Sequence, residues 1–163
     1  MIVPDAASLR MAYGSFPSGV AAVCALRDGA PVGMVVSSFV AVSMQPPLVA
    51  VCVQHTSTTW PLLADRPRLG LSVLGSAHDR ACRQIAAKTG DRFAGIDHTV
   101  TTEGAVLLHD AATWWDCSTH DVMAAGDHDV VLLRVEALQV HDGVAPLVFH
   151  SSRFHTLAPL ATS

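Results

Sequence analysis

Short apolar segments separated by turn residues recur along most of the chain. The continuous apolar run at 48–53 is typical of a strand that is buried on both faces. The dipeptide Asp28-Gly29 favours a tight hairpin turn, and it lies between the apolar segments 20–26 and 31–36. The same pattern predicts further strands at residues 68–74, 106–108, 111–119, 130–140, 147–150 and 154–157.

Helical segments are few and short. Residues 5–13 mix Ala, Leu, Arg and Met, and Asp5 is placed to cap the helix that they predict. Residues 58–64 predict one or two helical turns, and 77–88 predict a longer helix. Many strands with few helices indicate a mainly β protein, and we expect a closed antiparallel, Greek-key-like barrel that forms one domain over residues 1–163.

The composition restricts the class of partner. Half of the 163 residues are hydrophobic and only 15% are charged, and the mean hydropathy of +0.38 leaves more apolar surface than one small core needs. We therefore expect a subunit interface between identical chains. Ten basic against fourteen acidic residues give a net charge of -4, which disfavours nucleic-acid binding. No apolar run has the length of a membrane span, and residues 1–9 lack a signal-peptide pattern, so we expect a cytoplasmic protein that does not bind membranes.

Several kinds of chemistry are disfavoured. The chain contains neither the GxGxxG dinucleotide fingerprint nor the P-loop pattern, which excludes a Rossmann or P-loop enzyme. Nine histidines occur without the HExxH pattern, so we expect no metal site. The cysteines lie far apart, with no CxxC pair, and we interpret them as small core residues; they are Cys24, Cys52, Cys82 and Cys117.

Two segments carry candidate binding chemistry. In 33–39, two hydroxyl residues follow a buried strand, and in 54–61 four consecutive hydroxyl residues stand where a helix is expected to begin. A helix N-terminus offers free N–H groups and a partial positive charge, so hydroxyls there can complete a phosphate site. Simple capping of the helix by Ser57 or Thr58 is the open alternative.

Six segments, in this order along the chain, resemble the short-chain flavin reductases, the small components of two-component flavin monooxygenase systems. The resemblance implies an FMN-binding split barrel and a homodimer with its flavin sites close to the subunit interface. It also implies hydride transfer from NADH or NADPH to FMN or FAD, after which reduced flavin passes to a separate monooxygenase. The segments are 16–20, 33–39, 46–48, 56–61, 91–95 and 126–128.

The resemblance also implies the site residues. One group would line the flavin ring and ribityl chain: Val35, Val36, Ser37, Ser38 and Phe39. A second group belongs to the segment that holds the flavin phosphate: Gln54, His55, Ser57, Thr58 and Thr59. A third group would lie near the flavin and the nicotinamide, with the histidine of a Gly-Asp-His motif as the catalytic, nicotinamide-positioning residue: Arg92, Phe93 and His128. Phe93 could instead be a core aromatic, and His128 a surface histidine at a strand end.

Some positions depart from the common pattern of the family. Val35 and Val40 replace threonines that many relatives have, and Ala41 replaces a frequent serine, so fewer hydroxyls face the flavin. Two alternatives to a reductase therefore stay open. One is a flavin-binding carrier or partner subunit without nicotinamide turnover, and the other is a flavin-dependent biosynthetic enzyme. The choices between FMN and FAD, and between NADH and NADPH, also stay open.

Overall fold

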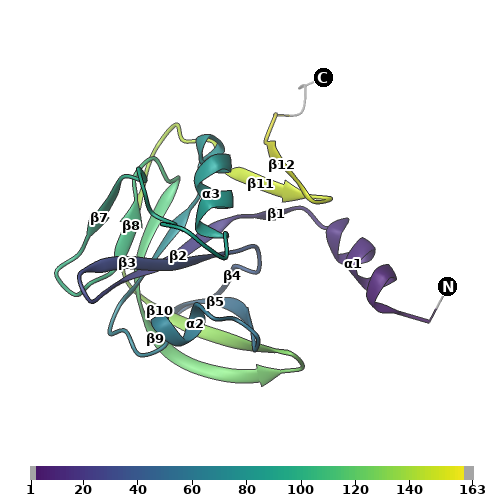
Figure 1. The fold of residues 1–163 in the computed structure, drawn as a ribbon, viewed down its shortest axis with the longest axis horizontal. Coiled ribbons are helices and arrows are strands. Elements are labelled where there is room, and N and C mark those ends of the chain that lie inside the picture. The colour runs from purple at the N-terminus through teal and green to yellow at the C-terminus, as the bar shows by residue number, and fades with distance from the viewer. Residues whose placement is uncertain (1–2, 160–163) are drawn as a thin grey trace.

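A seven-stranded antiparallel sheet dominates the molecule, with the strand order β3-β2-β6-β9-β10-β5-β4. The computed structural model describes residues 3–159, so the two ends of the expected domain, 1–2 and 160–163, lie outside the described residues. Figure 1 shows α3 lying against the sheet, and α1 standing away from it at the N-terminal end of the chain. A three-stranded sheet, β1-β11-β12, lies on the side of α1, and β7 and β8 form a separate pair.

The elements have the following bounds. The helices are α1 (Ala6–Gly14), α2 (Trp60–Leu63), the 3-10 turn η1 (Ser76–His78) and α3 (Asp79–Ile85). The strands are β1 (Ser18–Gly19), β2 (Ala21–Arg27), β3 (Ala30–Val36), β4 (Val40–Met44), β5 (Pro47–Gln54), β6 (Leu69–Val73), β7 (His98–Val100), β8 (Val106–Leu108), β9 (Thr113–Ala125), β10 (His128–Val140), β11 (Leu147–His150) and β12 (Arg153–Thr156).

Local sequence signals produce several of these elements as predicted. The Asp5 carboxylate accepts the Ser8 N–H at 2.7 Å and caps α1. Asp28 and Gly29 both adopt positive φ, 51° and 79°, as the tight turn between β2 and β3 requires. Strands far outnumber helices in the structure, so the mainly β class predicted from the sequence is confirmed.

Other boundaries differ from the prediction. The helix expected over 77–88 is a 3-10 turn followed by α3, which ends at Ile85, and α2 is a single turn of four residues. β9 continues past the predicted end at 119 to Ala125, because β10 pairs with it along its whole length. Strands β1, β4 and β7 carried no recognised signal in the sequence.

The expected closed barrel is not observed among residues 3–159. The chain passes from β3 to β4 through a bend at 37–39 in place of a hairpin turn, and the two strands are the unpaired edges of the sheet. β4 pairs only with β5, through a register shift between Ala41 and Ser43. An open seven-stranded sheet therefore replaces the closed barrel.

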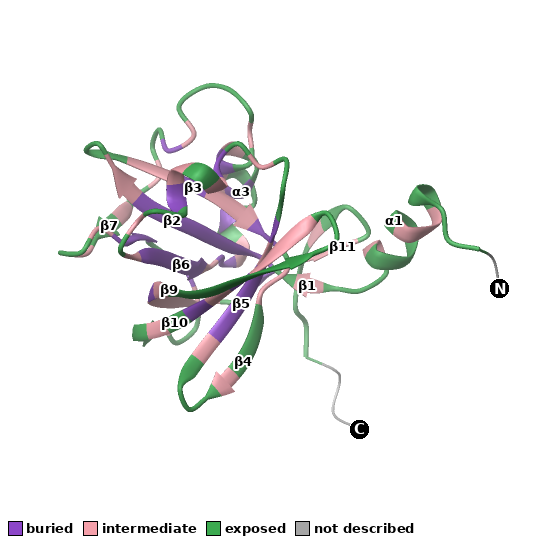
Figure 2. Ribbon diagram, turned by 90° about the horizontal axis from the view of Figure 1, so that it is seen from below, coloured by how far each residue is buried: buried purple, intermediate pink, exposed green. Residues whose placement is uncertain are grey.

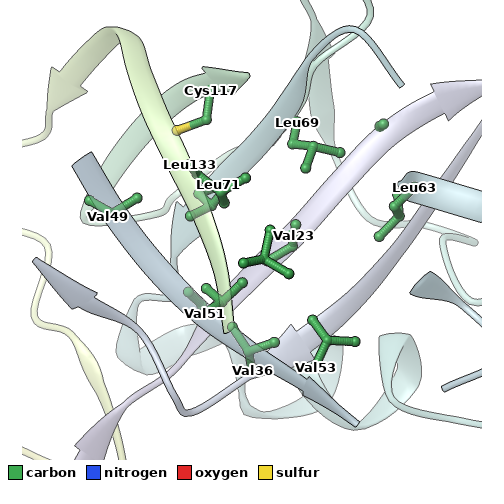
Figure 3. Close-up of a cluster of buried hydrophobic side chains, with 13 residues drawn as sticks. Val23, Val36, Val49, Val51, Val53, Leu63, Leu69, Leu71, Cys117 and Leu133 are labelled. Carbon is green, nitrogen blue, oxygen red and sulfur yellow. The ribbon is translucent and has the colours of Figure 1, made fainter. Parts of the chain in front are cut away.

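Two hydrophobic clusters cover the two faces of β2. Alternate residues of the segment contribute to different clusters, with Val23 in one and Cys24 in the other. The first cluster lies inside the curved sheet, where Figure 3 shows Val23, Val51 and Leu71 among its members. The second packs beneath α3 through Ile85. Figure 2 shows buried residues along β2, β6 and the middle of β5, which form the centre of the sheet.

Three of the cysteines are core residues, as expected. Cys24, Cys82 and Cys117 are buried and Cys52 is half-buried, and all four are free thiols. Burial raises the pKa of Cys24 and of Cys117 to about 12. None of the helices in the described chain has the length and apolar character needed to cross a membrane.

Gly70 allows β8 to lie directly against β6. A Cβ atom on Gly70 would stand 2.1 Å from the carbonyl oxygen of Val106, which is backbone and cannot rotate away. Close by, the hydroxyl of Ser72 accepts the N–H of Leu108 at 2.9 Å. The second cluster, which includes Val106, therefore depends on a glycine at position 70.

We expect Gly70→Ala to destabilise the protein by about 3 kcal/mol, because the strands must separate to admit the methyl group. Chemical denaturation followed by circular dichroism measures the change in the free energy of unfolding. Gly19→Ala is the matched control, since nothing lies within 4 Å of the Cβ that it would add. Equal stability of the two variants would contradict this explanation.

Candidate functional site

A polar cavity of about 330 Å³ lies between the loop after β5 and the end of α3. The hydroxyl-rich segment predicted from the sequence forms one wall, and two cationic side chains stand on the other. The lining residues are Thr56, Ser57, Thr58, Thr59, Leu62, Ala86, Ala87, Lys88 and Arg92. Hydroxyl donors and cations on facing walls suit an anion such as a phosphate.

Arg92 is held in place by protein oxygens. Its Nη1 donates to the hydroxyl of Thr59 at 3.1 Å and to the carbonyl of Ile85 at 3.4 Å. Thr59 is buried, so this bond fixes the guanidinium on the inner wall of the cavity. The remaining N–H groups of Arg92 are available to a ligand, since a guanidinium carries five.

The helix that follows the hydroxyl segment contributes less than expected. α2 has only four residues, so it supplies little of the dipole that the sequence suggested. The Ser57 hydroxyl accepts the N–H of Trp60, the first residue of α2, at 3.1 Å, although the N-cap position itself is Thr59, whose side chain makes no capping bond. The positive charge of the cavity comes from Lys88 and Arg92 instead.

A second, mostly apolar cavity of about 270 Å³ adjoins the first. Strand β3, helix α3 and the β11–β12 hairpin each form one wall. The lining residues are Val20, Val35, Val36, Ser37, Cys82, Arg83, Ala86, Phe149, Ser152 and Phe154. Ala86 lines both cavities, so they meet at the end of α3. Together they can hold a ligand with a flat apolar part and a phosphate.

Only part of the predicted 35–39 segment faces this cavity. Val35, Val36 and Ser37 line it. The Ser38 hydroxyl instead accepts the Cys52 N–H at 2.8 Å and donates to the Cys52 carbonyl at 3.1 Å. Phe39 stacks on Trp115, with ring centroids 4.8 Å apart, and packs against the first cluster. Ser38 and Phe39 therefore join the bend to the sheet.

Gln54, His55 and His128 lie together at one end of the β5–β10 ladder, where Gln54 pairs with His128. His55 Nε2 lies 3.0 Å from a carboxylate oxygen of Asp129, and His128 Nδ1 lies 2.6 Å from one of Asp127. The hydrogen bond from His128 lowers the pKa of the Asp127 carboxyl. Although these residues adjoin the hydroxyl segment in the chain, they line neither of the two cavities.

Phe93 lies in the core beside the cavities. It is buried in the second cluster, meets His98 edge-on at 6.3 Å, and would contact a Cβ atom at Gly33. This placement agrees with the alternative of a core aromatic. Nowhere in residues 3–159 do three His, Cys, Asp or Glu side chains gather as a metal site would require.

Comparison with known proteins identifies the family. Residues 13–158 match the family described as "Flavin reductase like domain". The chain belongs to the flavin reductase-like family. The match covers both cavities and almost the whole described chain, so the resemblance seen in the sequence is confirmed.

Individual members of the flavin reductase-like family are similar over most of their length. The structure of the NADH:FAD oxidoreductase SgcE6 of Streptomyces globisporus, in complex with NAD and FAD fragments, superposes with a TM-score of 0.92 at 32% identity and covers 99% of both chains. The actinorhodin polyketide dimerase of Streptomyces coelicolor is 37% identical over 158 residues, which are 96% of this chain and 89% of that protein. The flavin-dependent monooxygenase reductase subunit HsaB of Rhodococcus jostii is 32% identical over 155 residues, 95% of this chain and 80% of that protein.

The flavin reductase-like site also contains residues that sequence reasoning missed. Arg83 lies over the ring of Phe154, with its guanidinium carbon 4.8 Å from the ring centroid. Ser151 and Ser152 both adopt positive φ, 48° and 62°, in the turn of the β11–β12 hairpin. Neither feature had a recognisable signal, because the turn lacks glycine and the arginine and phenylalanine come from distant segments.

We expect Ser38→Ala to lower the free energy of unfolding of this flavin reductase-like protein by about 2 kcal/mol, because it leaves the N–H and C=O of Cys52 without their partner. Ser37→Ala is the control, since Ser37 is exposed and lines the cavity. Denaturant titration of both variants gives the comparison. If Ser38→Ala were as stable as Ser37→Ala, the hydroxyl would not hold the bend.

Proposed function

We propose that this protein is an NAD(P)H:flavin oxidoreductase that transfers hydride from NADH or NADPH to FMN or FAD and supplies the reduced flavin to a separate monooxygenase. The observation that carries the proposal is the junction of the two cavities at Ala86. It provides an apolar space for a ring beside a cationic space for a phosphate. The names of the relatives support it, since SgcE6 is an NADH:FAD oxidoreductase and HsaB is a monooxygenase reductase subunit.

In this proposal each cavity binds one part of the flavin. Val35, Val36 and Ser37 contact the ring, and Thr58, Thr59 and Arg92 bind the phosphate. The flavin, when bound, accepts hydride from the nicotinamide. The protein's part is to bring the two rings face to face and to exclude water.

His128 is proposed as the residue that orients the nicotinamide. An ionised Asp127 carboxylate can only accept, so Nδ1 is the donor in their 2.6 Å hydrogen bond, and Nε2 of the neutral ring is then a hydrogen-bond acceptor. The carboxamide of a nicotinamide has an N–H₂ group that such an acceptor can bind. Asp127 thus selects the tautomer that His128 needs for this role.

A second candidate function has a specific observation in its favour. The chain is 37% identical to a protein named actinorhodin polyketide dimerase. That relationship favours a flavin-dependent enzyme acting on a biosynthetic substrate, with the same cavities holding the flavin. A reductase turns over with NAD(P)H and flavin alone, whereas this second enzyme requires a further substrate.

The deciding experiment adds NADH or NADPH to the purified protein with FMN or FAD and follows absorbance at the nicotinamide band. We expect flavin-dependent oxidation of the nicotinamide in at least one of the four combinations. Bound flavin without nicotinamide oxidation would overturn the reductase proposal and favour the biosynthetic enzyme or a flavin carrier. Protein without flavin is the control for direct oxidation by oxygen.

We further propose that the chain is one split-barrel domain that acts as a homodimer in the cytoplasm. The described part of α1 buries no residue and leaves Met11 and Tyr13 exposed. The edge strand β4 exposes Val40, Val42 and Met44. Uncovered apolar side chains on an edge strand favour association, and a second copy would cover them and bring its own β4 beside this one.

We expect sedimentation to give twice the 17.1 kDa of one chain. Val42→Glu should shift the protein toward monomer, because it places a charge in the proposed interface. Thr102→Glu is the control, since Thr102 is exposed in the β7–β8 turn. A wild-type protein that sediments as a monomer would disprove the homodimer.

A further inference from the structure

Among residues 3–159, Arg83 is the one charged side chain that lines the apolar cavity. It lies on α3, one turn before Ala86, where the two cavities meet. The ion pairs described for residues 3–159 do not include Arg83. Arg83 is exposed, so its charge is in contact with solvent, and it serves no salt bridge within the described chain while lining a mainly apolar space.

Phe154 fixes the position of this guanidinium. The guanidinium carbon of Arg83 lies 4.8 Å from the Phe154 ring centroid, a cation–π contact. Phe154 in turn packs on Phe149, with centroids 5.5 Å apart. Because a guanidinium stacked on a ring keeps its N–H groups around its edge, Arg83 can still donate hydrogen bonds while Phe154 holds it.

The other polar groups of the cavity are small. They are the hydroxyls of Ser37 and Ser152 and the thiol of Cys82, whose pKa burial raises to about 11. The apolar part of the lining consists of Val20, Val35, Val36, Ala86, Phe149 and Phe154. The cavity therefore suits a flat ring with one polar, acceptor-rich edge and one hydrocarbon edge.

A flavin ring has this division, with carbonyl oxygens and ring nitrogens on its pyrimidine edge and methyl groups on the opposite edge. We propose that Arg83 recognises the pyrimidine edge of the flavin ring, and that Phe154 acts through Arg83 as a positioning residue. The proposal rests on the proposed function and deepens it. It divides recognition between two arginines, with Arg83 binding the ring and Arg92 binding the phosphate.

The test uses two flavins that differ only in the phosphate, riboflavin and FMN, and measures dissociation constants by quenching of flavin fluorescence. Arg83→Gln should weaken both flavins by the same factor, about tenfold for a lost charged hydrogen bond. Arg92→Gln should weaken the binding of FMN and leave the dissociation constant of riboflavin unchanged. Arg80→Gln is the matched control on α3, because Arg80 is exposed and lines neither cavity.

Two results would overturn the proposal. One is an Arg83→Gln protein that binds riboflavin as tightly as the wild type does. The other is a loss of affinity that is confined to FMN, which would mean that Arg83 binds the phosphate. Wild-type protein that binds neither flavin would instead contradict the proposed function, so the two failures are distinguishable. Thermal melting checks that each variant is folded.

The positioning role of Phe154 is tested by a double-mutant cycle. Phe154→Leu keeps an apolar wall but removes the aromatic face beneath Arg83. It should weaken riboflavin binding in the wild type and have little further effect in Arg83→Gln, because the interaction is then already lost. If Phe154→Leu lowered the affinity for riboflavin equally in the wild type and in Arg83→Gln, Phe154 would act only as part of the cavity wall.

Discussion

Where β3 passes into β4, one hydroxyl replaces two backbone hydrogen bonds. The β4–β5 ladder ends at the pair Val40 and Ala50, and beyond it the N–H and C=O of Cys52 both bond to the Ser38 hydroxyl. An unpaired backbone group in this half-buried strand would be costly. Ser38 therefore lets the chain turn away from the sheet, and the residues just before the bend are then free to line a cavity.

The early end of α3 has a similar effect on the polar cavity. Because the helix stops at Ile85, the carbonyl of that residue accepts a bond from Arg92. Ala86 follows in the lining of both cavities. If the helix continued to residue 88, as the sequence predicts, backbone groups such as the Ile85 carbonyl would be used in hydrogen bonds within the helix.

The sequence predicted the parts of the fold that rest on local signals. The Asp28-Gly29 turn, the buried run in β5 and the Asp5 cap all formed as expected, since each depends on neighbouring residues. β4 was missed because it does not have the pattern of a buried strand. Its valines are exposed in the described chain, and the strand pairs on one side only, with β5.

For the site, the residue pattern singled out the hydroxyl loop and the segment before the bend, and the family resemblance placed Ser38 and Phe39 against the flavin. In the structure Ser38 bonds to Cys52 and Phe39 stacks on Trp115. Which side chains turn inward depends on contacts with Cys52 and Trp115, which are distant in the chain. The contact between Arg83 and Phe154 is invisible for the same reason. The family resemblance did not reveal this contact either, because a resemblance assigns roles only to positions that match the motifs of the family.

The burial of Cys24 and Cys117 affects how readily a flavin reductase is oxidised by the products of its own reaction. Reduced flavin released into aerated solution reacts with oxygen and produces hydrogen peroxide, which oxidises thiolates much faster than thiols. Cys24 and Cys117 lie in the core with pKa values of about 12, and are therefore protonated at neutral pH. Core packing therefore keeps the Cys24 and Cys117 thiols in their unreactive form, whereas Cys82 lines the cavity and Cys52 is half-buried.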